Sequence, residues 1–291
     1  MRLRRRRGWT TVRVISGLGN QLFQYAAGRA VAERTNTRLR FDISYLDHEA
    51  DRPYALGDFH IRAEVVGGEA RDRAFMADHA AEDAYARERF GASVVREVNP
   101  THETELLSAA PADSFLAGYW QNGEYFEQYA RAIRRELRPR MTAAIRSGRR
   151  AIAESDESVA LHVRRGDFAS DAGSAARFGA LEADYYGRAA NLVLERRPRA
   201  TFFIFSDDPE WCRAELRLPG PAQIVSGTNR PFEDLALIAA CNDAIVSNST
   251  FAWWGAWLGE RPDSLIVAPK VPFNEPLLNQ RSTYPDRWLR V

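Results

Sequence analysis

The hydrophobic residues of this chain recur at two different periods, and the two periods alternate along the N-terminal part. Residues 11–16 (TVRVIS) have the β-branched composition of a strand, and residues 17–20 (GLGN) interrupt it. The apolar residues of 21–35 then recur at helical spacing, and residues 37–44 (TRLRFDIS) alternate as a second strand. This order predicts a βαβ unit, whose two strands pair in parallel.

The next part of the chain is less regular. Residues 47–110 show no clear period, and we expect helices and loops there. Residues 113–120 (DSFLAGYW) predict a strand, and residues 123–140 an amphipathic helix that ends near Pro139.

A second alternating series begins near residue 157. The small residues of 169–180 predict a loop after its first strand. We expect strands at 158–163, 200–206, 222–227, 243–248 and 264–270, and helices at 182–198, 208–216, 231–242 and 249–259. The two series predict two Rossmann-like domains, residues 1–154 and 155–291. Ligands of such sheets bind at the carboxyl ends of the strands.

Charge and cysteine content exclude several classes of function. The chain has 40 basic and 39 acidic residues in 291, so we expect no nucleic-acid partner. Cys212 and Cys241 lack the spacing of metal ligands, and so few cysteines fit a reducing cytoplasm. Five arginines occur in the first seven residues without a following apolar segment, which predicts a solvated extension with at most peripheral membrane contact.

Arg164, Arg165 and Asp167 follow the predicted strand 158–163 directly. They fit either a surface salt-bridge cluster or an anion site, because a guanidinium offers paired donors to phosphate oxygens and Asp167 can orient it. Side chains alternate in direction at the end of a strand. We therefore expect one arginine to face a ligand and the other to hold the loop.

Two further polar groups follow predicted strands. Asn248, Ser249 or Thr250 can cap the next helix, or leave its first N–H groups to an anion. Asp207 and Asp208 can accept hydrogen bonds from a ribose or a guanine, cap a helix, or hold a magnesium ion.

Two other features complete the candidate chemistry. Trp253 and Trp257 share one face of a predicted helix, so we expect them in the core. The turn 17–20 has only part of a dinucleotide fingerprint, since Leu22 stands in the place of the third glycine. We expect this turn to bring Asn20 close to a ligand without forming a nicotinamide site.

Taken together, these segments resemble a known family. The motifs GLGNQLFQYA, HVRRGDF, FFIFSDD, SNSTFAWWGAWL and IVAPK, spread over about residues 14–273, are similar to those of bacterial α1,2-fucosyltransferases of glycosyltransferase family 11. The resemblance implies a GT-B fold, with two Rossmann-like domains facing a cleft. It implies GDP-β-L-fucose as donor, the 2-hydroxyl of a β-galactoside in a surface glycan as acceptor, inversion at the anomeric carbon, and no metal or other cofactor.

The resemblance also implies roles for residues. Arg164 would hold the β-phosphate, His162 and Asp234 would contact guanine, and Asn20 would lie near donor and acceptor. Arg165 would then be the arginine that holds the loop, together with Asp167. Catalysis would then rest on Arg164, Asn20 and His162. The donor set is Arg164, Arg165, Asp167, His162, Asp207, Asp208, Asp234, Asn248, Ser249, Thr250 and Lys270, and the acceptor set is Asn20, Gln21, Asp42, Tyr119 and Gln121.

Three questions stay open at this point. Lys270 is the one lysine of the chain, and either adds charge near the ligand or is an ordinary exposed lysine. Asp42 is a candidate base for the acceptor hydroxyl. The alternatives to α1,2-fucosyl transfer are a fucosyltransferase of another linkage or acceptor, and a sugar-nucleotide- or glycan-binding protein without turnover.

Overall fold

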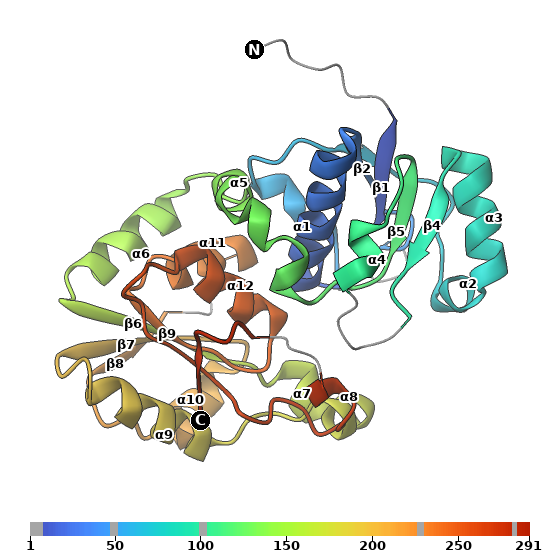
Figure 1. Cartoon of the computed structure of the whole chain (residues 1–291). Helices are drawn as coiled ribbons and strands as arrows, with labels where there is room; N and C mark the ends of the chain where they lie inside the picture. The colour runs from blue at the N-terminus through green and yellow to red at the C-terminus, as the bar shows by residue number, and fades with distance from the viewer. Residues whose placement is uncertain (1–7, 47–51, 99–103, 226–229, 281–283) are drawn as a thin grey trace, which may run out of the picture. The chain divides into compact units, whose positions relative to one another are not determined.

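The structure is a computed structural model that describes residues 8–46, 52–98, 104–225, 230–280 and 284–291 (Figure 1). The chain divides into two compact units, Met1–Arg138 and Pro139–Val291. The division falls earlier than the predicted boundary at 154/155. The helix of residues 143–153, for which we had no prediction, therefore belongs to the C-terminal unit.

The N-terminal unit is a five-stranded sheet with helices, and its strand order is β3-β2-β1-β5-β4. All pairings are parallel, so the predicted opening βαβ unit is confirmed. Its elements are β1 (Trp9–Arg13), α1 (Leu18–Thr35), β2 (Arg38–Asp42), β3 (Glu64–Val66), α2 (Arg73–Ala77), α3 (His79–Phe90), β4 (Ser93–Arg96), α4 (Thr104–Ser108), β5 (Ser114–Ala117) and α5 (Ala130–Glu136), with 3₁₀ turns η1 (Leu56–Asp58), η2 (Gly123–Tyr125) and η3 (Glu127–Tyr129).

Close packing of α1 on β1 fixes the turn between them. A Cβ at Gly28 would lie 2.3 Å from Cγ2 of Val12, so only a glycine lets the helix approach the strand this closely.

The predicted helix 123–140 is shorter than expected. Two 3₁₀ turns replace its first part, where Asn122 accepts a hydrogen bond from the backbone N–H of Glu124 and directs the chain into a tighter turn.

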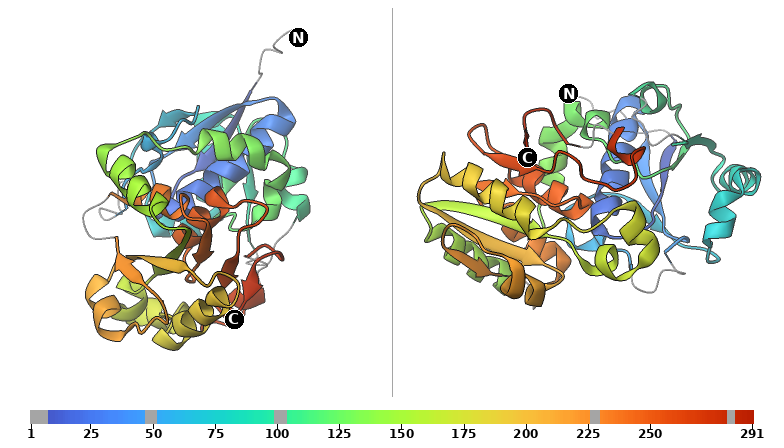
Figure 2. Two further views of the ribbon diagram at one scale, coloured as in Figure 1. Left: turned by 90° about the vertical axis from the view of Figure 1, so that its left-hand side faces the viewer. Right: turned by 90° about the horizontal axis from the view of Figure 1, so that it is seen from below.

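The C-terminal unit is a six-stranded parallel sheet with the order β11-β10-β9-β6-β7-β8. Figures 1 and 2 show α9 and α10 on one face of this sheet and α6, α11 and α12 on the other. Its elements are α6 (Ala143–Ala153), β6 (Glu157–Val163), α7 (Gly166–Ser170), α8 (Ala172–Arg177), α9 (Ala183–Leu194), β7 (Ala200–Ser206), α10 (Pro209–Glu215), β8 (Ala222–Ile224), α11 (Pro231–Ile238), β9 (Asp243–Ile245), α12 (Thr250–Gly259), β10 (Ile266–Ala268), η4 (Leu278–Gln280) and β11 (Leu289–Arg290).

One predicted loop of this unit is helical. Residues 169–180 contain the end of α7 and all of α8, because Asp171 caps α8 by accepting from the backbone N–H of Ser174 (2.7 Å), and alanines follow that cap. The predicted strand 222–227 is shorter than expected in its described part, and its last two residues lie outside the described residues.

The core of the C-terminal unit is rich in aromatic residues. Trp253, Trp254 and Trp257 are almost fully buried, and the rings of Trp253 and Trp257 stack with centroids 5.7 Å apart. This confirms the prediction that Trp253 and Trp257 pack in the core. The central strands β6 and β7 are buried on both faces, which anchors the loops at their carboxyl ends.

Candidate active site

The predicted donor residues come together at one edge of the C-terminal sheet. Strands β9, β6 and β7 are neighbours and run in parallel, so their carboxyl ends lie side by side. Arg164 follows β6, Asp207 follows β7, and Asn248 follows β9. The topology therefore gathers the three motifs, which lie far apart in the sequence.

Arg164 is held by two carboxylates. Its guanidinium pairs with Asp167 and with Asp207, whose Oδ2 lies 2.6 Å from Nη1. A Cβ at Gly166 would lie 2.6 Å from the same Oδ2, so the glycine leaves room for this contact. A guanidinium has five N–H donors, and two ion pairs leave some of them available to an anion. Salt bridge and anion site are therefore compatible at this residue.

Arg165 has a different environment. Its Nε lies 3.3 Å from Oδ2 of Asp208, and its guanidinium carbon lies 4.2 Å from the ring centroid of Trp211. Its backbone N–H donates to Asp207 (2.8 Å). Arg165 thus holds the loop, as expected, but through Asp208 and Trp211. The prediction that it does so together with Asp167 is corrected, because Asp167 pairs with Arg164.

The two aspartates after β7 have structural partners. Asp208 caps α10 by accepting from the backbone N–H of Trp211 (3.0 Å), as one of the open alternatives predicted. Asp207 joins the loops after β6 and β7 through its contacts with Arg164 and Arg165. With Asp167 included, this cluster has three carboxylates and two guanidinium groups. Attraction of an anion must therefore come from Arg164 and from nearby N–H groups.

His162 lies at the end of β6, and 7% of its surface is exposed. Its Nδ1 is 2.9 Å from Oγ of Ser247, and its ring centroid is 5.5 Å from that of Phe251. Burial, and then the charge of Arg164, lower the pKa of His162 to about 3. The imidazole is therefore neutral at physiological pH, and it can make hydrogen bonds without adding a positive charge.

The start of α12 is capped by one residue of the predicted set. Ser249 accepts from the backbone N–H of Phe251 (3.2 Å), which leaves the other first-turn N–H groups of this ten-residue helix, including that of Thr250, facing its N-terminal end. Asn248 has a structural role, because its Nδ2 donates to the carbonyls of Gly179 and Pro272 (2.8 Å each). These bonds tie the ends of two loops to β9.

Two further donor candidates lie on neighbouring elements. Asp234 is half-buried in the first turn of α11. Lys270 is exposed just after β10, and its backbone N–H donates to the carbonyl of Val291 (3.0 Å). Their predicted contacts with the guanine and the diphosphate stay predictions.

The N-terminal unit brings two of its predicted residues together. Oδ1 of Asn20 accepts from Nε2 of Gln121 (2.7 Å), and Nδ2 of Asn20 donates to Oγ of Ser16 (2.9 Å). Tyr119 lies two residues before Gln121 in the sequence and is 40% exposed, and its backbone N–H donates to Glu97 (2.8 Å). These residues lie after the neighbouring strands β1 and β5.

Two residues of the predicted acceptor set are buried. Gln21 has no exposed surface, and its amide bonds the carbonyls of Ser16 and Pro53 and the N–H of Ala55. It ties the loop before η1 to the start of α1, so its assignment to substrate contact is corrected to a structural role.

Asp42 also has no exposed surface. One of its carboxylate oxygens accepts from Ser44 (2.7 Å), and the other accepts from the Tyr85 hydroxyl (2.8 Å). A base must reach the proton that it removes. The interpretation of Asp42 as the base for the acceptor hydroxyl is therefore wrong.

Three residues of these clusters were missed in the sequence. Ser16 and Glu97 organise the turns that carry Asn20 and Tyr119, and Ser247 faces His162. The small hydroxyl residues beside the glycine turn and the SNST motif were the available signal for Ser16 and Ser247. No signal in the sequence pointed to Glu97, because nothing in the pattern around residue 97 links it to residues 119–120.

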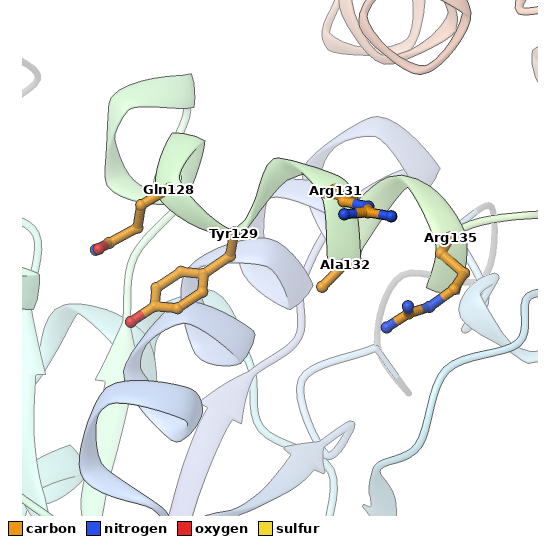
Figure 3. Close-up of a pocket in the computed structure, with 5 residues that line it drawn as sticks. All are labelled: Gln128, Tyr129, Arg131, Ala132 and Arg135. Atoms are coloured by element: carbon orange, nitrogen blue, oxygen red, sulfur yellow. The ribbon is translucent and has the colours of Figure 1, made fainter.

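The surface pocket of Figure 3 lies elsewhere in the N-terminal unit, on η3 and α5, and is lined by Gln128, Tyr129, Arg131, Ala132 and Arg135. None of the predicted site residues lines it.

Among the described residues there is no group of three or more His, Cys, Asp or Glu side chains that could hold a metal ion. In the same part of the chain no helix is long and apolar enough to cross a membrane. The arginine-rich residues 1–7 lie outside the described residues.

Two Rossmann-like units, one of which has an arginine and a helix N-terminus at the ends of its strands, are typical of glycosyltransferases of GT-B fold. The model of the family "Glycosyl transferase family 11" matches residues 1–291, so the chain belongs to this family and is a glycosyltransferase. The resemblance stated from the sequence motifs is thereby confirmed.

Relatives of known name match over most of their length. The chain is 25% identical to an α-1,2-colitosyltransferase of Escherichia coli, over 96% of this chain and 97% of the relative. It is 24% identical to the O-antigen biosynthesis glycosyltransferase WbnK of Escherichia coli (88% and 92% covered). It is 25% identical to the galactoside 2-α-L-fucosyltransferase Sec1 of Mus musculus (98% and 74% covered).

Solved structures share the fold at low sequence identity. A variant of Arabidopsis thaliana FUT1 in complex with GDP has a TM-score of 0.54 at 13% identity, over 89% of this chain and 70% of that chain. NodZ α-1,6-fucosyltransferase soaked with GDP-fucose has a TM-score of 0.50 at 15% identity, over 86% and 92%. The predicted GT-B fold class is confirmed.

Proposed function

We propose that this family 11 glycosyltransferase transfers L-fucose from GDP-β-L-fucose to the 2-hydroxyl of a β-galactoside in a surface glycan. The observation that carries the proposal is the geometry of Arg164, which two carboxylates orient at the carboxyl end of β6, beside the neutral His162. Relatives named as galactoside fucosyltransferases and as an O-antigen glycosyltransferase support the acceptor class.

In this proposal the chemical problem is the departure of GDP. The acceptor oxygen forms a bond to the anomeric carbon, the bond from that carbon to the β-phosphate oxygen breaks, and the hydroxyl proton is released. Negative charge grows on the β-phosphate, where donors that are already oriented stabilise it. Arg164 and the first-turn N–H groups of α12 supply such donors.

Inversion and metal independence are part of the same proposal. A direct displacement from the β-linked donor gives an α-linked product in one step. The guanidinium of Arg164 is a permanent cation that can take the place of a divalent ion at the leaving diphosphate. His162 is neutral, so it serves the nucleotide as a hydrogen-bonding partner without adding charge.

A second donor has an observation in its favour. The match to the α-1,2-colitosyltransferase extends over nearly the whole of both chains. Colitose is L-fucose without its 3-hydroxyl group, so the two donors share the nucleotide and differ at one position of the sugar. GDP-colitose is therefore the alternative donor for the same site and the same α1,2 linkage.

The testing experiment measures GDP release from each donor, with and without lactose or N-acetyllactosamine, in the presence and absence of EDTA. We expect acceptor-dependent GDP release from GDP-fucose, no effect of EDTA, and an α1,2-linked product by NMR. Higher kcat/KM with GDP-colitose would assign that donor instead. No GDP release with either donor and any galactoside would reject the enzymatic proposal, and inhibition by EDTA would reject metal independence.

A further inference from the structure

The amide of Asn20 is held from two sides by residues of different loops. Gln121 donates through Nε2 to Oδ1 of Asn20, while Nδ2 of Asn20 donates to Ser16. If the Asn20 amide were reversed, its Nδ2 would face Nε2 of Gln121, and two donors would oppose each other. The Gln121 side chain therefore fixes which end of the Asn20 amide points away from the loop after β5.

The backbone on both sides of this contact has an unusual conformation. Ser16 has a φ of 66° and Trp120, which directly precedes Gln121, has a φ of 57°. Residues other than glycine rarely adopt this left-handed conformation, and it is retained where surrounding contacts enforce it, often at functional sites. Both residues thus flank the contact between Asn20 and Gln121, since Ser16 bonds Asn20 and Trp120 precedes Gln121.

The turn that carries Gln121 is held by contacts that do not involve its side chain. Glu97 accepts from the backbone N–H groups of Tyr119 (2.8 Å) and Trp120 (3.0 Å), and the side chain of Trp120 is fully buried. The N–H of Asn122 donates to the carbonyl of Trp120 (2.8 Å). Truncation of Gln121 should therefore leave the turn intact.

We infer that Gln121 is a positioning residue for Asn20. The Asn20 amide, held in this orientation, donates its second Nδ2 hydrogen to an oxygen of the reacting substrates. This inference rests on the proposed function and on the role that the family resemblance implies for Asn20, near the donor and the acceptor. The hydrogen bond from Gln121 also polarises the Asn20 amide, which strengthens the bond that Nδ2 donates. The recognised group is an oxygen that accepts a hydrogen bond, either a hydroxyl of the acceptor sugar or an oxygen of the donor.

The test uses single and double variants of the complete chain. Gln121→Ala removes the donor, and we expect kcat for transfer to fall about 10- to 100-fold with little change in thermal stability, because small misplacements of a reacting group have effects of this size. Gln128→Ala is the matched control, since Gln128 lies on η3 in the pocket of Figure 3, and it should keep wild-type activity.

Gln121→Glu gives a readout that a purely structural role would not produce. An ionised carboxylate cannot donate to Oδ1 of Asn20, whereas a protonated one can. Its activity relative to wild type should be as low as that of Gln121→Ala at pH 8 and should rise toward pH 5, since an ordinary glutamate has a pKa of about 4.3. The activity of Gln121→Ala relative to wild type should stay constant between pH 8 and pH 5.

Donor hydrolysis without acceptor distinguishes the two sources of the oxygen. If Gln121→Ala lowers the rates of hydrolysis and of transfer equally, Asn20 contacts an oxygen of the donor. If it lowers the rate of transfer alone, Asn20 contacts a hydroxyl of the acceptor. Gln121→Ala should cost little when added to Asn20→Ala, because both act through the same bond. Wild-type activity of Gln121→Ala, or full additivity with Asn20→Ala, would overturn the inference.

A second measurement does not depend on turnover. The side-chain amide NMR signal of Asn20, identified by its loss in Asn20→Ala, should shift in Gln121→Ala and in Gln121→Glu but not in Gln128→Ala. An unchanged signal overturns the inference even if the wild-type protein transfers no sugar. An inactive wild-type protein with the expected shift rejects the proposed function and leaves the contact between Gln121 and Asn20 supported.

Discussion

Among single residues, Arg164 has the most direct connection to the proposed chemistry. Arg164→Ala should lower kcat about 100- to 1,000-fold, the loss typical of removing one donor that stabilises a developing oxyanion. Arg164→Lys keeps the charge but lacks the planar arrangement of donors that Asp167 and Asp207 orient. Its kcat should therefore lie between those of the wild type and of Arg164→Ala. GDP release under saturating donor and acceptor measures both variants.

The matched control for Arg164 is Arg188→Ala. Arg188 lies on α9, its side chain is 60% exposed, and its ion pair with Asp184 is long at 4.0 Å. Exposed pairs of this kind contribute little to stability. Wild-type turnover is expected for this control, and wild-type turnover in Arg164→Ala would contradict the role given to Arg164.

The burial of His162 predicts a loss of stability in mild acid. Its pKa is about 3 in the folded chain and near 6.5 when it is exposed on unfolding. At a pH between these two pKa values, His162 is protonated in the unfolded state and neutral in the folded state, so a fall in pH favours unfolding. The penalty is nearly absent above pH 7 and grows as the pH falls below 6.5. At pH 5 it should lower the free energy of unfolding by about 2 kcal/mol.

Urea unfolding of the wild type and of His162→Gln at pH 7 and pH 5 measures this effect. Glutamine can keep a hydrogen bond to Ser247 but does not titrate, so the variant should lose less stability between the two pH values. An equal loss in both proteins would show that His162 is not the group responsible.

At the scale of secondary-structure elements, α12 is fixed by close packing on α11. A Cβ at Gly255 would lie 2.5 Å from Cγ2 of Ile238, so Gly255→Ala should lower the free energy of unfolding by about 1–3 kcal/mol. Gly187→Ala on α9 is the control, because no atom lies within 4 Å of a Cβ there. It should raise stability by up to about 1 kcal/mol, through helix propensity alone.

Thermal and urea unfolding of these two variants measure the difference. A neutral Gly255→Ala would mean that α11 can move away from α12 at no cost. In that case the N-terminal end of α12 would be less firmly positioned than its packing indicates.

The elements that could be predicted from the sequence are those with strong internal patterns. Strands β6 and β7 are seven residues each and nearly all buried, and their predicted bounds agree with the structure within one residue. The edge strand β3 has only three residues, Glu64–Val66, and none is buried, so it has no hydrophobic alternation to detect. The signal for β4 is equally short, with one buried residue in four.

The site shows the same division between local and long-range information. The placement of Arg164 at a strand end follows from the local pattern, whereas its partner Asp207 is 43 positions away and is brought near by strand pairing. The burial of Asp42 depends on Tyr85 and Ser44, and the contacts of Asn248 depend on loops at 179 and 272. Such tertiary partners decide whether a polar residue faces substrate or the core.

For the whole molecule, each of the two units has its own parallel sheet, and the predicted donor residues lie in the C-terminal one. GDP without a sugar should therefore stabilise that unit specifically. At a GDP concentration 100 times the Kd, the gain is about 2.7 kcal/mol by mass action. Hydrogen exchange with and without GDP should show protection in peptides that cover 162–168 and 247–252, the ends of β6 and β9.

The same measurement on Arg164→Ala provides the control, because that variant should show weaker protection at equal GDP while its fold is unchanged. Buried amides of β1 and β5 should exchange at the same rate with and without GDP, since these strands belong to the separate sheet of the N-terminal unit. Protection confined to residues 8–138 would place the nucleotide in the other unit. The assignment of Arg164 as the diphosphate ligand would then be wrong, even for an active enzyme.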